Sequence, residues 1–270
     1  MAKYALCIQG GGSRGAYGAG VLDVLMRNGY WADEVIGTSA GALIGCNYVS
    51  HNIGRSGNMM LTMMSDRHFV QPLNYLKKGS IFDFHYLVYD LAQKGLSFDF
   101  DYFAKNPCKF YVVSSSCTTG EIRYFEKRDP EFWTALASSA SLPLTSKPVF
   151  VHGEPCLDGG VSCPIAFEKA IADGYEKVVV VATREKGYRK PTMRESEHLL
   201  AKQMYRKFPS FAPFYEKSHA VYNTQMDELD FLSQKERLFV IYPSIPPKIS
   251  HASKSKKKIQ QLLDLGEKDM

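Results

Sequence analysis

Long apolar runs are missing from this sequence. No stretch of its 270 residues approaches the ~20 consecutive apolar residues that a transmembrane helix needs. The first residues, Met1 to Ile8, contain only a short apolar run, which is too short for a secretory signal peptide. The expected location of the chain is therefore the cytoplasm.

Paired cysteines and a broad basic surface are missing as well. The six cysteines include no C-x-x-C pair, which argues against a disulfide framework and against a zinc site. We expect six reduced thiols, no metal and no cofactor. The net charge is +5, but the segment 248–270 holds six lysines and only three acids, so it supplies +3 of that charge. The remaining chain carries only +2, and no nucleic-acid partner is predicted.

The chain length favours one large α/β domain, which we place at residues 1–247. Residues 248–270 are predicted to form a basic, helical C-terminal tail. Its apolar residues Ile259, Leu262 and Leu263 lie within a helical turn of lysines. We interpret the tail as a solvated helix, with peripheral contact to an anionic membrane surface as the alternative.

Strand and helix patterns alternate along the chain. The spacing of apolar residues predicts strands near 4–9, 34–37, 109–116, 121–126, 149–151, 156–157, 177–183 and 238–242. Helices are predicted near 14–28, 39–50, 164–172, 195–207 and 213–234, and a further helix is expected to begin at Asp129-Pro130 and run to about Ser141. This alternation predicts an α/β layered fold with a mainly parallel sheet.

A glycine-rich loop follows the first predicted strand and opens a helix. It reads Gly10-Gly11-Gly12-Ser13-Arg14-Gly15. Glycines let the backbone turn sharply and direct consecutive N–H groups into one concavity that favours negative charge. Either a phosphate or the oxyanion of an acyl intermediate would fit. Because residues 10, 12 and 15 also match G-x-G-x-x-G, a dinucleotide-binding loop remains an alternative.

Two further motifs follow. Gly37-Thr38-Ser39-Ala40-Gly41 fits the nucleophile elbow G-x-S-x-G, in which small residues permit a strained turn that exposes the serine hydroxyl. The alternative for Ser39 is an ordinary helix N-cap. Asp158-Gly159-Gly160 could supply a carboxylate, although Asp-Gly is also a common hairpin turn.

The order of these motifs resembles the patatin-like phospholipase family. In that family a G-G-G-x-R/K-G loop precedes G-x-S-x-G, and a distant D-G-G or D-G-A supplies an aspartate. A fourth stretch, residues 137–143 (A-S-S-A-S-L-P), resembles the A-S-x-x-x-P segment between them. The resemblance covers about residues 4–183. It implies a three-layer α/β/α sandwich with a mainly parallel central sheet, and a serine acyl-hydrolase acting on a lipid or fatty-acyl ester.

The resemblance also implies a role for each residue. Ser39 would attack the ester and Asp158 would be its base, with no histidine in the mechanism. The loop Gly10, Gly11 and Gly12, with Arg14, would form the oxyanion hole. The sequence contains seven histidines, so the presence of a Ser–His–Asp triad is not excluded by composition. We interpret His152, the nearest to Asp158 in sequence, as structural.

Two alternatives from other classes remain. A nicotinamide- or flavin-binding oxidoreductase would use residues 10–15, but it needs an acidic residue at the end of the second strand, where Thr38 and Ser39 stand. A non-catalytic lipid-binding module is the other.

The Met- and aromatic-rich stretch 59–103 is a candidate acyl-chain surface or, alternatively, hydrophobic core. The sequence makes no prediction of the oligomeric state.

Overall fold

The computed structural model of the chain describes residues 3–63, 66, 69, 71, 74–75, 79–80, 83 and 97–270. Its strands form one eight-stranded sheet. They are β1 (Tyr4–Ile8), β2 (Glu34–Thr38), β3 (Lys109–Ser116), β4 (Ile122–Glu126), β5 (Val149–Val151), β6 (Glu154–Asp158), β7 (Lys177–Val181) and β8 (Leu238–Ile241).

Helices connect these strands. The short 3₁₀ helices are η1 (Gly12–Arg14) and η3 (Gly159–Val161). The α-helices are α1 (Gly15–Arg27), α2 (Ala40–Val49), α3 (Arg55–Met63), α6 (Phe100–Lys105), α7 (Phe132–Ser139), α8 (Phe167–Ala172), α9 (Glu195–Met204), α10 (Phe211–Gln234) and α11 (Lys256–Asp269).

The sheet is mainly parallel. Strands run in the order β5-β6-β3-β2-β1-β7-β8, and β4 also pairs with β3. The five neighbouring strands β3, β2, β1, β7 and β8 are parallel to one another. Strands β4, β5 and β6 add an antiparallel extension on the β3 side. Ile8 is in register with Gly37 of β2 and with Val181 of β7. The carboxyl ends of β1, β2 and β7 therefore lie level at one edge, so the segments that follow them meet there.

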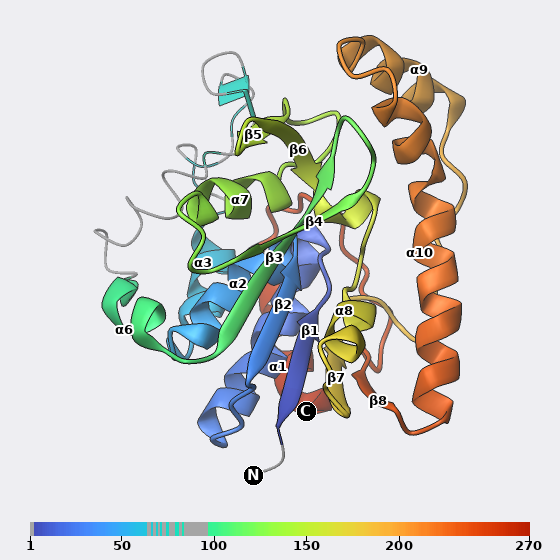
Figure 1. Cartoon of the computed structure of the whole chain (residues 1–270). Coiled ribbons are helices and arrows are strands. Elements are labelled where there is room, and N and C mark those ends of the chain that lie inside the picture. The colour runs from blue at the N-terminus through green and yellow to red at the C-terminus, as the bar shows by residue number, and fades with distance from the viewer. Residues whose placement is uncertain are drawn as a thin grey trace.

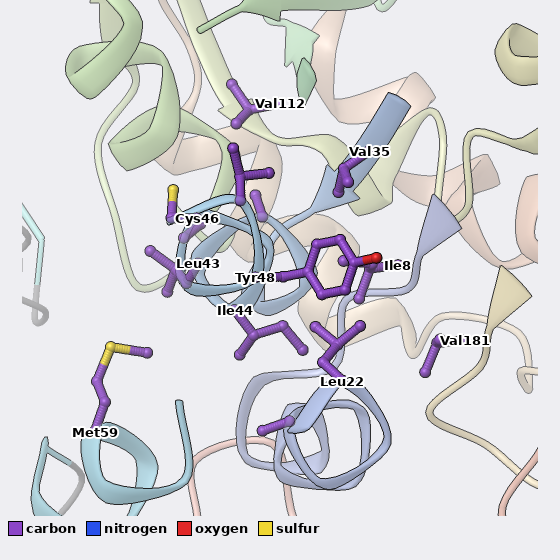
Figure 2. Packing of buried hydrophobic residues seen from close by; sticks show 14 of the residues in the cluster. Ile8, Leu22, Val35, Leu43, Ile44, Cys46, Tyr48, Met59, Val112 and Val181 are labelled. Atoms are coloured by element: carbon purple, nitrogen blue, oxygen red, sulfur yellow. The ribbon is translucent and has the colours of Figure 1, made fainter. Parts of the chain in front are cut away.

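Side-chain alternation along the strands divides the core between the two faces of the sheet. Leu6 and Ile8 of β1 belong to the cluster that includes α1 and α2, whereas Ala5 and Cys7 pack with α8 and α10. Figure 1 shows α1, α2, α3 and α7 on one side of the sheet and α8 and α10 on the other. Figure 2 shows Ile8 of the sheet among helical side chains such as Leu22 and Tyr48. The expected three-layer α/β/α sandwich is confirmed.

The C-terminal helix α11 is not solvated as expected. Its apolar residues Ile259, Leu262 and Leu263 are buried, and the helix packs against α1 and α3. The contact with α1 is close because both helices present glycine. A Cβ added at Gly266 would lie 2.1 Å from the carbonyl oxygen of Tyr17. The apolar face of α11, which was predicted to be solvated, is therefore covered by α1 and α3.

Two local expectations were also wrong or incomplete. Helix α7 begins at Phe132 rather than at Pro130, because the Asp129 carboxylate accepts the amide of Glu131 (2.8 Å) and binds the ring of His152 (2.8 Å). The stretch 59–103, for which no helix was predicted, contains the end of α3 and the first residues of α6.

The described side chains of that stretch are mostly core. Met59, Met60, Met63, Phe69 and Phe103 are buried. Met64, Phe82, Phe84, Tyr86 and Tyr89 lie outside the described residues.

Two expectations about the chain as a whole can be compared with the structure. All six cysteines are free, and all six are buried. Across the residues described, no helix combines the length and the hydrophobicity needed to cross a bilayer.

The packing of α11 on α1 predicts the sign of one substitution. Gly266→Ala should lower the free energy of unfolding by about 1–3 kcal/mol, because the new methyl group meets the α1 backbone. On a solvated helix the same change would raise it by up to about 1 kcal/mol, since alanine favours the helix over glycine. Urea unfolding measures the difference. Gln261→Ala, on the exposed side of α11, is the control and should change stability little.

Candidate active site

The turn between β2 and α2 presents Ser39 at the carboxyl edge of the sheet. Ser39 is the N-cap of α2 and has φ 57° and ψ −126°, a conformation that a non-glycine residue rarely adopts. A Cβ at Gly41 would lie 2.3 Å from the carbonyl oxygen of Ile8, so no larger residue fits there. The G-x-S-x-G spacing is therefore a steric requirement of this turn. The backbone of Ser39 is therefore strained, and the residue lies at the start of α2.

Asp158 lies directly opposite the serine. It is the last residue of β6, and its Oδ2 accepts a hydrogen bond of 2.6 Å from the Ser39 hydroxyl. Its Oδ1 accepts the amide of Gly160 at 2.7 Å. Ser39 and Asp158 are only 6% and 3% exposed. Two residues 119 apart in sequence thus share one buried hydrogen bond.

Burial changes the acidity of Asp158. Removal from water raises its pKa to about 6, while the hydrogen bonds from Ser39 and Gly160 and the positive charge of Lys190 act in the opposite direction. The carboxylate is a stronger base than an exposed aspartate and is still ionised at neutral pH. A group of this kind can accept a proton from a neighbouring hydroxyl.

The A-S-x-x-x-P stretch holds both residues in position. The Ser139 hydroxyl accepts the backbone N–H of Ser39 (3.0 Å), and the Ser141 carbonyl accepts the backbone N–H of Asp158 (2.9 Å). On the other side, the Ser115 hydroxyl donates to the Asp158 carbonyl (3.0 Å). Short hydroxyl side chains satisfy the buried backbone groups next to the site.

The glycine loop lies beside Ser39. A Cβ at Gly10 would come within 2.7 Å of the Ser39 Cβ. Gly12 has φ +56°, and a Cβ there would be 2.3 Å from the His251 carbonyl. Within the described part of the chain, the amides of Gly11 and Gly12 donate to no acceptor. Two N–H groups are therefore free in the loop that adjoins the serine.

Thr183, which follows β7, fixes the start of this loop. Its amide donates to Oε1 of Gln9 (2.6 Å) and its hydroxyl donates to the Gly10 carbonyl (2.6 Å). No spacing rule marks Thr183, because its partners lie more than 170 residues away. Sequence reasoning missed this residue.

The side chain of Arg14 points to the C-terminal region. It is 5% exposed. Its Nη1 donates to the Ile249 carbonyl (3.5 Å), and its Nη2 bonds to Nε2 of His251. The His251 carbonyl in turn accepts the amide of Ser13 at 2.7 Å. Nε of Arg14 is buried and has no hydrogen-bond partner in the described structure. The C-terminal segment thus braces the glycine loop, a role that the sequence did not indicate.

No histidine separates Ser39 from Asp158. His152 binds the Asp129 carboxylate at the protein surface. His251 and His219 line the same cavity as Ser39, where Nε2 of His251 faces the Arg14 guanidinium and Nδ1 of His219 contacts the Glu216 carbonyl. Of the seven histidines, His68 and His85 lie outside the described residues. The direct Ser39–Asp158 contact leaves no place for a third group between them.

Ser39 borders two cavities of different character. The larger, about 620 Å³, has a mixed lining in which charged side chains such as Arg184 and Lys190 lie beside apolar ones such as Leu142 and Met193. The smaller, about 40 Å³, is apolar and is lined by residues such as Leu43, Met60, Met63, Phe69 and Leu142. The hydroxyl therefore lies where a molecule with one apolar and one polar end would place its middle. Across the described residues, no three His, Cys, Asp or Glu side chains gather as metal ligands would.

Two protein-family models match parts of the chain. The family model described as patatin-like phospholipase matches residues 6–171. A second model, described as a domain of unknown function (DUF6363), matches residues 208–270.

Individual relatives are distant. The uncharacterised protein YjjU of Escherichia coli (strain K12) is 26% identical over 254 residues, which are 90% of this chain and 69% of that protein. Among solved structures, VipD from Legionella pneumophila aligns with 97% of this chain and 67% of its own, at 15% identity and a TM-score of 0.40. Since the first family model spans well over half of the sequence, the chain belongs to the patatin-like phospholipase family of lipid ester hydrolases.

Proposed function

We propose that this protein hydrolyses carboxylic esters of lipids through a Ser39–Asp158 dyad. The observation that carries the proposal is the buried 2.6 Å hydrogen bond from the serine hydroxyl to the carboxylate. In a Ser–His–Asp triad an imidazole stands between these groups. Here the carboxylate itself accepts the proton as Ser39 attacks the acyl carbonyl, and later returns it to the leaving alcohol.

Oxyanion stabilisation is assigned to the glycine loop. The free amides of Gly11 and Gly12 would donate to the carbonyl oxygen as it becomes negative, and Gly10 sets the loop against Ser39. The N-terminus of α2 adds a favourable dipole at the serine. Arg14 supports the loop through its bonds to the C-terminal segment. Water then attacks the acyl-enzyme while Asp158 takes a proton from it, and Asp158 returns this proton to Ser39 as the acyl–oxygen bond breaks and the acid leaves.

The two cavities give the substrate an orientation. The first carbons of the acyl chain would lie against the apolar pocket near Met60 and Met63, and the alcohol part would lie in the larger cavity among its charged side chains. The bond to be cleaved then lies at Ser39, which borders both. A lipid ester has this distribution of apolar and polar parts.

Labelling with a fluorophosphonate tests the nucleophile. We expect one adduct, on Ser39, because among the serines that the structure describes only this one combines an elbow hydroxyl at the border of the cavity with free amides beside it. Ser39→Ala should abolish labelling and the hydrolysis of p-nitrophenyl butyrate while the melting temperature stays close to that of the wild type. Peptide mass spectrometry locates the adduct. Labelling that persists at full stoichiometry in the variant would contradict the assignment, and the absence of any labelling or hydrolysis would favour a non-catalytic lipid-binding module.

Replacement of the carboxylate tests the base. Asp158→Asn keeps the size of the side chain and most of its hydrogen bonds but cannot accept the serine proton. Its kcat should fall by about 10²–10⁴, or further if the pair acts as a unit. Asp129→Asn and His152→Gln, which change the surface pair, are the matched controls and should retain activity. A comparable loss in the His152 variant at equal stability would restore the triad.

The acidity of Asp158 predicts the pH dependence. The base must be ionised, and burial raises its pKa to about 6. The kcat/KM for a neutral ester should therefore rise with pH, with a midpoint near pH 6, and level off above pH 7. Rates measured from pH 4.5 to 8, with enzyme returned to pH 7.5 to confirm that inactivation is reversible, give the profile. A rate that stays constant down to pH 5 would show that no group of this acidity governs the reaction.

A further inference from the structure

Helix α9 presents apolar side chains to solvent beside the larger cavity. Leu199 is 59% exposed and Leu200 is 44% exposed. The other side of the helix is packed, because Ala201 is buried in a cluster that includes Tyr205 and Phe211. A single leucine on a protein surface is ordinary, but two adjacent ones on the outward side of a helix next to a cavity are typical of a binding surface.

The exposed leucines lie in a stretch whose charges all have one sign. Residues 198–210 contain Lys202, Arg206 and Lys207 and no acid. All three cations are exposed, and Lys202 shares one side of the helix with Leu199, three residues before it. Within the part of the chain that the structure describes, none of the three forms an ion pair. We call these two leucines and three cations the outer face of α9.

The inner side of α9 is fixed to the rim of the cavity. Tyr205, directly after the helix, is buried. Its hydroxyl donates to the Ser146 carbonyl (3.0 Å) and accepts the amide of Leu144 (3.0 Å). Thr145, between these two residues, lines the larger cavity, and so does Glu197 from the first turn of α9. The outer face of α9 is therefore held in a set position beside the cavity.

The helix also lies at the end of the molecule where Ser39 lies. Strands β1 and β2 run toward the glycine loop and the serine, and Figure 1 shows α9 beyond that end of the sheet, at the top of the view. The apolar residues of α11, the other candidate for membrane contact, are buried against α1 and α3. A flat surface bound to the outer face of α9 would thus face the end of the sheet that carries the cavity.

We propose that the outer face of α9 docks the protein onto an anionic membrane surface. Its leucines enter the head-group region and its cations lie against anionic lipids. The delivery of membrane esters to Ser39 rests on the proposed ester hydrolysis, whereas the docking itself does not. Neither family model that matches the chain covers α9, since one ends at residue 171 and the other begins at residue 208.

Charge complementarity favours a lipid surface over a second copy of the chain. In a symmetric dimer the same patch of both copies meets itself. A contact through the outer face of α9 would therefore bring the cations of both copies together, and residues 198–210 supply no acid to neutralise them. Anionic head groups provide the missing charge, and the membrane interior accepts the leucines.

Vesicles of ether-linked lipids test the docking apart from hydrolysis, because these lipids contain no carboxylic ester. In sedimentation, the full chain should bind an equimolar mixture of phosphatidylglycerol and phosphatidylcholine about tenfold or more tightly than phosphatidylcholine alone. The combined changes Lys202→Gln, Arg206→Gln and Lys207→Gln should weaken binding about 100-fold, since each cation at an anionic surface contributes about fivefold. Leu199→Gln together with Leu200→Gln should weaken it about tenfold or more.

Matched controls change the opposite end of the sheet. Lys3, Lys109 and Lys177 are exposed at or next to the amino ends of β1, β3 and β7, and their combined change to glutamine removes the same charge. Ile53→Gln, in the turn after α2, removes an exposed apolar side chain. Both controls should bind nearly as the wild type does, because charges more than about 8 Å from the lipid surface are screened at physiological salt. All variants should keep the melting temperature of the wild type.

Hydrolysis separates the docking from the chemistry. Both α9 variants should cleave the soluble ester p-nitrophenyl butyrate at the wild-type rate. At subsaturating lipid, they should release fatty acid from ester-linked vesicles more slowly by the factor that their binding falls. Ser39→Ala should bind the ether-linked vesicles as the wild type does. Vesicle binding that meets these expectations without hydrolysis of any ester would uphold the docking surface and reject the proposed function alone.

Three results would overturn the docking surface. One is vesicle binding that persists in both α9 variants or falls equally in the controls. Another is equal binding to anionic and neutral vesicles. The third is a concentration-dependent dimer that Leu199→Gln with Leu200→Gln dissociates, in the absence of vesicle binding, which would assign the outer face of α9 to a second copy of the chain.

Discussion

The site depends on keeping an ionised carboxylate buried against a serine hydroxyl. A buried carboxylate is costly unless hydrogen bonds or charges compensate it. Here the Ser39 hydroxyl and the Gly160 amide each bond one oxygen of Asp158, and Lys190 supplies a nearby positive charge. These contacts keep the pKa of the carboxyl near 6 despite its burial. The balance leaves a group that is ionised at neutral pH and is basic enough to receive a proton.

That balance requires parts of the chain that are far apart. Ser39 follows β2, Asp158 ends β6, and the glycine loop follows β1. The parallel register brings the ends of β1, β2 and β7 level, so Thr183 after β7 can hold Gln9 and Gly10. The C-terminal segment then closes over the loop, because the His251 carbonyl bonds Ser13 and α11 is anchored on α1. The region matched by the second family model is thus part of the same structure as the glycine loop.

Local patterns predicted the fold and much of the neighbourhood of the site. The strands and most helices follow from apolar periodicity, and Gly41 is dictated by contact with the β1 backbone. Helix α11 was misjudged because an amphipathic helix has the same pattern whether its apolar face meets another helix or remains unpartnered. Thr183 and Lys190 were not found because their positions depend on contacts made across the fold. The orientation of the Arg14 guanidinium was equally invisible, since its partner His251 lies 237 residues away.

The residues proposed for the reaction and the cations of the larger cavity come from different parts of the chain. The proposed nucleophile and base lie within residues 6–171, where the patatin-like model matches. Arg184 and Lys190 follow β7, outside that match, in a loop fixed by α10. Loops at the carboxyl ends of parallel strands can change their side chains without disturbing the sheet that supports the reacting groups. Because Arg184 stacks on Tyr188 of its own loop, its position is set by that loop rather than by the elbow. The charges of this loop can therefore vary while the Ser39–Asp158 geometry stays constant.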